Sequence, residues 1–111
     1  MVDAGPELSP TLIQIGSEGA DADYPENPVS LHDIYCRVGG AEVGQVETAV
    51  TINSNYVIGD HFWLWRADHG VGTEWMEGQN KHGLIVNGDH VTIYGLFNEH
   101  FQAYQTLWKG E

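Results

Sequence analysis

Carboxylates and imidazoles gather at the ends of two similar stretches of the chain. Asp68 and His69 close one stretch, and Glu99 and His100 close the next. Two carboxyl groups can hydrolyse a glycosidic bond, with retention when they lie ~5–5.5 Å apart and inversion at ~6.5–9.5 Å. A neighbouring imidazole or aromatic wall can raise one carboxyl pKa and make that group the acid. We therefore predict Asp68 and Glu99, assisted by His69, as catalytic residues.

Other interpretations of these carboxylates stay open. Asp68 could pair instead with Glu74 or Glu77 from the loop that follows it. It could also form a structural ion pair with Arg66, with His69 in an ordinary turn. In that case the acidic groups serve only to solvate the surface.

Aromatic side chains form a second candidate set, because three of them take the seventh place of three similar stretches. Aromatic faces stack well on the apolar faces of sugar rings. The alternative is that the loop of residues 70–82 or a partner chain buries them, since large exposed aromatic patches are unusual in monomers. The predicted sugar-binding residues are Tyr35, Trp63, Trp65, Trp75, Phe97 and Arg66.

The stretches that carry these residues share one hydrophobic pattern. They are Val29–Arg37, Val57–Trp65 and Val91–Glu99, each with apolar or small residues mainly at places one, three, six and eight. A straight strand keeps a strict period of two, because alternate side chains face opposite sides. The single parity break therefore predicts two short strands joined by a bend. Three such units indicate stacked coils of a β-solenoid.

An apolar strand ending in asparagine precedes two of the units. Asn53 and Asn87 occupy equivalent places, so we predict that their amides form a ladder between coils. Each coil would then have three short strands, and no segment is convincingly helical. The alternative is that these asparagines lie in the hairpin turns of a meander or sandwich. We predict an all-β fold with residues 1–10 as a loose lead-in and residues 11–111 as about three solenoid coils.

Composition excludes several partners. The net charge is −12 with only four lysines and arginines, whereas phosphate binding needs clustered basic residues. Nucleic acid and anionic membrane surfaces are therefore poor partners, and no apolar run approaches the ~20 residues that span a bilayer. We expect a secreted, extracellular protein, although the chain shows no signal peptide. The single cysteine, Cys36, is predicted to be an inward-facing core thiol.

Six histidines invite a metal hypothesis, since several follow an acidic residue directly. No established zinc or copper ligand spacing is present, so no metal site and no cofactor are predicted. A transition metal stays open as an alternative. Calcium also stays open, through the acidic loop that contains Asp21, Asp23 and Glu26, although this loop lacks the twelve-residue calcium pattern.

Two strings carry a resemblance to a known family. They are NSNYVIGDHFWLWRADHG (residues 53–70) and HGLIVNGDHVTIYGLFNEHFQAYQTLW (residues 82–108). They resemble large secreted bacterial and fungal proteins with a right-handed parallel β-helix of the pectate-lyase superfamily, similar to α-1,3-glucanase and mycodextranase enzymes and often joined to discoidin-like modules. The resemblance covers about Pro10 to Trp108. Two departures are Gly59, where a larger inward residue is expected, and Lys109, where the family has asparagine.

The resemblance implies a carbohydrate-active protein whose partner is a polysaccharide. We expect a glycoside hydrolase that acts on a glucan through the paired carboxylates and the aromatic face. The alternative is a non-catalytic carbohydrate-binding or oligomerising structural piece of a larger secreted enzyme. Because a solenoid has open ends, we also expect a truncated piece of a longer chain whose ends are covered by homo-oligomerisation.

Overall fold

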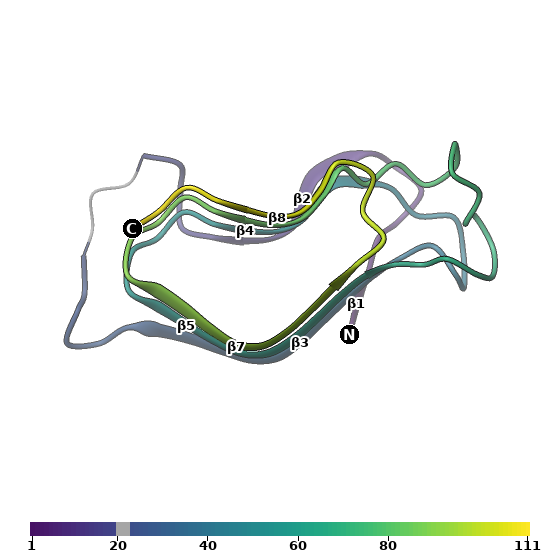
Figure 1. Cartoon of the computed structure of the whole chain (residues 1–111). Coiled ribbons are helices and arrows are strands. Elements are labelled where there is room, and N and C mark those ends of the chain that lie inside the picture. Colours follow the sequence, from purple (N-terminus) through teal and green to yellow (C-terminus); the bar gives the residue numbers. More distant parts are fainter. Residues whose placement is uncertain (20–22) are drawn as a thin grey trace.

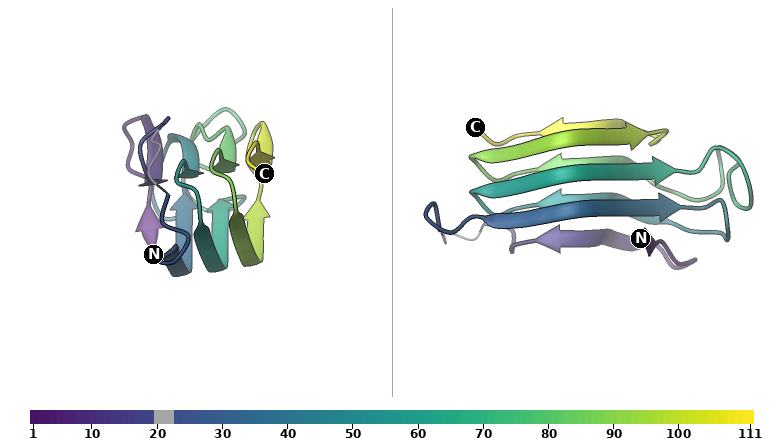
Figure 2. Two further views of the ribbon diagram at one scale, coloured as in Figure 1. Left: turned by 90° about the vertical axis from the view of Figure 1, so that its left-hand side faces the viewer. Right: turned by 90° about the horizontal axis from the view of Figure 1, so that it is seen from below.

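The computed structural model describes residues 1–19 and 23–111, which form two parallel β-sheets (Figure 1). Successive strands alternate between the sheets, and each pairs in parallel with the strand one coil further on. The described residues form no helix. This arrangement is a parallel β-helix, as predicted, with its coils stacked as ladders (Figure 2). One sheet contains β1 (Val2–Asp3), β3 (Val29–Val38), β5 (Val57–Arg66) and β7 (Val91–Glu99), and the other contains β2 (Ser9–Ile15), β4 (Val46–Ile52), β6 (His82–Val86) and β8 (Tyr104–Trp108).

The parity break is a sharp bend within each long strand. Asp33, His61 and Gly95 occupy the fifth place of the three units, with φ angles of 54°, 63° and 64°. The pairing register passes over this place, while the residues on both sides of it pair normally. The predicted bend is therefore confirmed. Each coil, however, has two strands, one of them bent, and not three separate ones.

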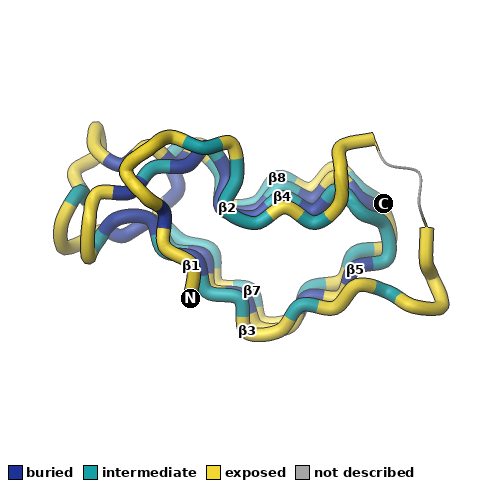
Figure 3. The backbone as a smooth tube through the Cα atoms, turned by 180° about the vertical axis from the view of Figure 1, so that it is seen from behind, coloured by how far each residue is buried: buried dark blue, intermediate teal, exposed yellow. Residues whose placement is uncertain are grey.

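The core lies between the two sheets. Val57, Phe62 and Leu64 point inward from β5 and are fully buried, and they pack with residues of β4 and β6 such as Ile52 and Leu84. Buried residues concentrate in β4, β5 and β6, whereas the loops at the two ends of the coil section and parts of β3 are exposed (Figure 3).

Position 59 requires a glycine because the ring of Phe62 occupies the space that a side chain would fill. A Cβ atom on Gly59 would lie 2.9 Å from Cζ of Phe62 and 3.2 Å from Cγ1 of Ile93. The departure from the family pattern is thus compensated by the large inward side chain three residues later.

Cys36 is a core thiol, as predicted. Only 2% of it is exposed, and burial raises its pKa to about 11. The thiol therefore stays protonated at neutral pH and contributes to packing.

The asparagine ladder is present. The Nδ2 group of Asn87 donates to Oδ1 of Asn53 at 2.7 Å, and Nδ2 of Asn53 donates to the carbonyl oxygen of Gly16 at 3.1 Å. Lys109 keeps the same backbone turn, since its N–H donates to the carbonyl of Val86 at 2.8 Å. The side-chain ladder thus links two coils, while the backbone turn continues beyond it.

The first ten residues are more ordered than predicted. Val2 pairs with Cys36 through β1, Ala4 is buried, and β2 already begins at Ser9. Val2 and Asp3 pair with β3 and Ser9 pairs with β4, so the residues predicted as a loose lead-in contribute to both sheets. No helix in the described part of the chain has the length and apolar character needed to cross a membrane.

Candidate functional site

Three aromatic side chains form a column across the outer face of the bent sheet. Tyr35 on β3 pairs in register with Trp63 on β5, which pairs with Phe97 on β7. Trp63 is 42% exposed and Phe97 54% exposed. The predicted column is confirmed, and the loop of residues 70–82 leaves it open to solvent.

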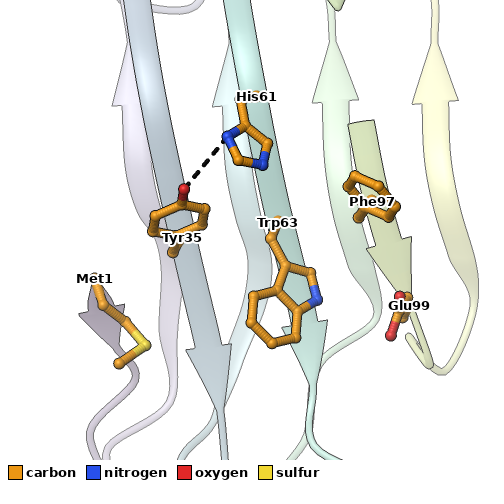
Figure 4. Close-up of a pocket in the computed structure, with 6 residues that line it drawn as sticks. All are labelled: Met1, Tyr35, His61, Trp63, Phe97 and Glu99. Carbon is orange, nitrogen blue, oxygen red and sulfur yellow. Dashed lines mark hydrogen bonds between the residues drawn. The ribbon is translucent and has the colours of Figure 1, made fainter. Parts of the chain in front are cut away.

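The column lines an open hollow of about 650 Å³, shown in Figure 4. His61 and Glu99 lie among its lining residues, with Met1 at its margin. Sequence reasoning assigned Glu99 to catalysis alone and gave His61 no role in this site. The available signal was the position of His61, which precedes Trp63 by two residues at the bend.

A second aromatic contact continues the surface toward the end of β5. The rings of Trp63 and Trp65 stack with their centroids 5.7 Å apart and an angle of 22° between planes. The Trp65 ring in turn lies 5.3 Å from the ring of His69. Aromatic surface therefore runs from the hollow to the carboxylates that follow β5.

The predicted carboxylates lie close together around one imidazole. The Nε2 atom of His100 lies 3.7 Å from Oδ2 of Asp68 and 4.0 Å from Oε2 of Glu99. Asp68 also accepts a hydrogen bond from Nδ1 of His69 at 2.9 Å. The structure thus brings Asp68, Glu99 and His69 to one end of the sheet, and their catalytic role stays a prediction.

The electrostatic surroundings of Asp68 do not suit the role of a general acid. The hydrogen bond from His69 is the main cause that holds the pKa of Asp68 below its ordinary value, with a smaller contribution from the charge of His100. The carboxyl group is half-exposed and stays ionised at neutral pH. Such a group can accept a proton but is poorly suited to donate one.

Arg66 does not belong to the exposed surface. It is only 4% exposed, and its guanidinium donates to the carbonyl oxygens of Glu77 at 2.8 Å and of Glu74 and Gly78 at 3.1 Å. Burial lowers its pKa. The prediction that Arg66 binds substrate is wrong because its donors are used by the loop. In the described part of the chain it also forms no ion pair with Asp68.

Trp75 lies in the loop that Arg66 organises. Its ring packs 5.4 Å from the Arg66 guanidinium carbon, and its carbonyl accepts from Nε2 of Gln102 at 2.7 Å. The side chain is 60% exposed, but it does not line the hollow. Contact between Trp75 and a sugar stays a prediction.

Two further histidine–carboxylate contacts lie on the bent sheet as isolated pairs. Nδ1 of His32 lies 3.3 Å from Oδ2 of Asp60, and Nδ1 of His61 lies 3.0 Å from Oδ1 of Asp33. Residues 1–19 and 23–111 contain no group of three ligating side chains that could hold a metal. In the calcium hypothesis, the position of Asp21 falls outside the described residues.

All 111 residues match the model of the LAM55 pectate lyase-like domain. The chain belongs to this family. An exo-beta-1,3-glucanase of Streptomyces sp. (strain SirexAA-E / ActE) is 49% identical over 111 residues, which are 100% of this chain and 18% of that protein. The predicted relation to β-helix proteins of the pectate-lyase superfamily is confirmed.

Two solved structures of a LAM55 relative have the same fold. The structure of sacteLam55A from Streptomyces sp. SirexAA-E aligns with a TM-score of 0.96 at 49% identity, covering 98% of this chain and 20% of that one. A single-substitution variant of sacteLam55A in complex with glucose aligns at 0.95, with the same identity and coverage. This chain therefore spans about a fifth of each relative. The curated relative's name specifies a β-1,3 linkage, whereas the sequence resemblance was to enzymes of the α-1,3 type.

Proposed function

We propose that the outer face of the bent sheet binds a β-1,3-glucan chain as part of a carbohydrate-active β-helix. The exposed column of Tyr35, Trp63 and Phe97 is the observation that carries this proposal. A LAM55 relative named as an exo-beta-1,3-glucanase supports the choice of linkage, and a variant of sacteLam55A carries glucose.

The spacing of the column suits a chain of sugar rings. Paired strands lie ~4.8 Å apart, so the aromatic rings form a nearly continuous apolar floor. Sugar rings stack on such a floor through their C–H faces and keep their hydroxyl groups at the edge. Glu99 lies at that edge and can accept hydrogen bonds from hydroxyl groups.

Hydrolysis is the second candidate function, favoured by the shared contact of Asp68 and Glu99 with His100. In this mechanism Glu99, in its protonated form, gives its proton to the leaving glycosidic oxygen. Asp68, held ionised by His69, takes a proton from the attacking water. The water oxygen bonds to the anomeric carbon as the glycosidic bond breaks. Without this step, the same surface serves in binding alone.

Retention on insoluble glucans separates these functions from one another and from a scaffold. The full chain is incubated with insoluble β-1,3-glucan, cellulose and α-1,3-glucan, and both depletion from solution and release of reducing ends are measured. Retention on β-1,3-glucan with release of reducing ends supports hydrolysis. Retention without release supports binding alone. Equal recovery from all three supernatants contradicts the proposed function.

A further inference from the structure

His61 holds a backbone conformation that favours glycine. Its φ angle is 63°, and Gly95 occupies the equivalent bend one coil further on with a φ of 64°. A bulky residue in this region is strained, and such strain persists only where the surroundings fix it. The bend itself therefore does not require an imidazole at this place.

The imidazole ring is held by two neighbours from β3. Its Nδ1 atom lies 3.0 Å from Oδ1 of Asp33 and 3.3 Å from the hydroxyl oxygen of Tyr35. The rings of His61 and Tyr35 also make an edge contact, with centroids 5.5 Å apart and planes at 88°. Because a carboxylate can only accept, Nδ1 carries the proton that it donates to Asp33.

This hydrogen bond fixes the chemistry of the other nitrogen. When the imidazole is neutral only one nitrogen is protonated, so with the proton on Nδ1 the Nε2 atom of His61 has a free lone pair. Figure 4 shows the ring at the wall of the hollow, with its second nitrogen turned toward Trp63 and Phe97. The lone pair therefore faces the space above the aromatic floor.

We infer that Nε2 of His61 accepts a hydrogen bond from a hydroxyl group of the sugar that stacks on Trp63. This inference rests on the proposed function and adds a second polar anchor to the site. His61 lies four residues before the place that pairs with Glu99, which is roughly 13 Å along the strand. The two polar groups thus lie at opposite ends of the aromatic floor.

The acidic surroundings of the hollow also define the class of sugar. Asp33 lies behind the imidazole, Glu99 lines the far end of the hollow, and the whole chain has a net charge of −12. A uronic acid or sulfated sugar would be repelled from this surface. His61 and the aromatic floor therefore select an uncharged sugar that presents hydroxyl donors.

Affinity measurements and NMR spectroscopy on the full chain test this inference, with a β-1,3-linked glucose tetrasaccharide as the probe. In His61→Asn the new residue also tolerates a positive φ, but its shorter side chain has no atom at the position of Nε2. His32→Asn is the matched control, because His32 is a similarly exposed histidine paired with Asp60. We expect His61→Asn to raise the dissociation constant about fivefold to tenfold and His32→Asn to leave it unchanged.

The ¹⁵N resonance of Nε2 reports the contact in the unaltered protein. We expect the His61 signal to shift on saturation with the tetrasaccharide, while the His32 signal stays in place. A stationary His61 signal overturns the inference, whatever the affinity of the variant. If Trp63→Ala weakens binding while the His61 signal does not move, the proposed function stands and the inference fails. If the unaltered chain does not bind the probe, both fail.

Discussion

Oδ2 of Asp68 lies 3.7 Å from Nε2 of His100, although the two residues belong to different coils. The contact exists because Asp68 lies two residues after β5 and His100 directly follows β7, and these strands pair with each other. It brings the carboxylate after β5 to the carboxylate of Glu99 at the end of β7. The stacking of coils, and not proximity in sequence, assembles this group.

The first prediction concerns hydrolysis by this group. Asp68→Asn removes the proton acceptor but keeps a side chain of the same shape, so release of reducing ends from β-1,3-glucan should fall at least about a hundredfold. Retention on the glucan should be unchanged, because Asp68 does not line the hollow. Glu26→Gln is the control, since Glu26 is an exposed acid in the loop between β2 and β3, whereas Asp68 lies in the loop after β5. Full release by a folded Asp68→Asn variant would remove Asp68 from the mechanism.

The second prediction follows from the depressed pKa of Asp68. A carboxyl group with a lowered pKa in the folded state stabilises the protein above its unfolded-state pKa, and this contribution is lost as pH falls through the folded value. The difference in melting temperature between the unaltered chain and Asp68→Asn should therefore be fully present at about pH 5. It should shrink below the ordinary value of 3.8. A difference that does not change between neutral pH and pH 2 would contradict this assignment.

The third prediction concerns Arg66 and its loop. Replacing Arg66 with methionine leaves the carbonyl groups of Glu74, Glu77 and Gly78 without their donor and should destabilise the chain by about 3 kcal/mol in urea denaturation. Residues 70–82 should also become more sensitive to limited proteolysis.

The control for Arg66 is Arg37→Met. Arg37 forms an exposed ion pair with Asp3 at 2.8 Å, and such pairs contribute about 1 kcal/mol or less. Equal losses for the two variants would contradict the buried, loop-organising role of Arg66.

The fourth prediction concerns the compensation between Gly59 and Phe62. Gly59→Ala places a methyl group 2.9 Å from the Phe62 ring and should destabilise the fold by about 1–3 kcal/mol. Phe62→Leu should reduce the additional cost of Gly59→Ala, because the two side chains share one space. Thermal denaturation of both single variants and the double variant measures this coupling. Strictly additive losses would show that the glycine serves another purpose.

Much of the fold was predictable because one hydrophobic pattern recurs in register. The seventh place of each unit gave the column of Tyr35, Trp63 and Phe97, and equivalent asparagines gave the ladder of Asn53 and Asn87. These features depend only on strand parity and on the alignment of repeats, which the sequence contains.

Arg66 was misassigned although its parity pointed inward. It alternates with Trp63 and Trp65, so it belongs with the buried side chains Phe62 and Leu64. A charged side chain is rarely buried without a partner, and its partners here are backbone carbonyls of a loop. Loop carbonyls leave no mark in the side-chain pattern, and therefore the partners that allow this guanidinium to be buried could not be predicted.

His61 was missed for a different reason. The bend at its position breaks the alternation, so parity does not tell which way the side chain points. Only the ring contacts with Asp33 and Tyr35 orient it toward the hollow.

The binding of β-1,3-glucan by the aromatic column is tested most directly by isothermal titration of the β-1,3-linked tetrasaccharide into Trp63→Ala and Trp108→Ala. The two tryptophans are equally exposed, at 42% and 43%, but Trp108 lies on the opposite sheet. We predict that Trp63→Ala weakens binding about tenfold or more, while Trp108→Ala binds like the unaltered chain. Equal affinity of the two variants, or no binding by the unaltered chain, would contradict a glucan site on the bent sheet.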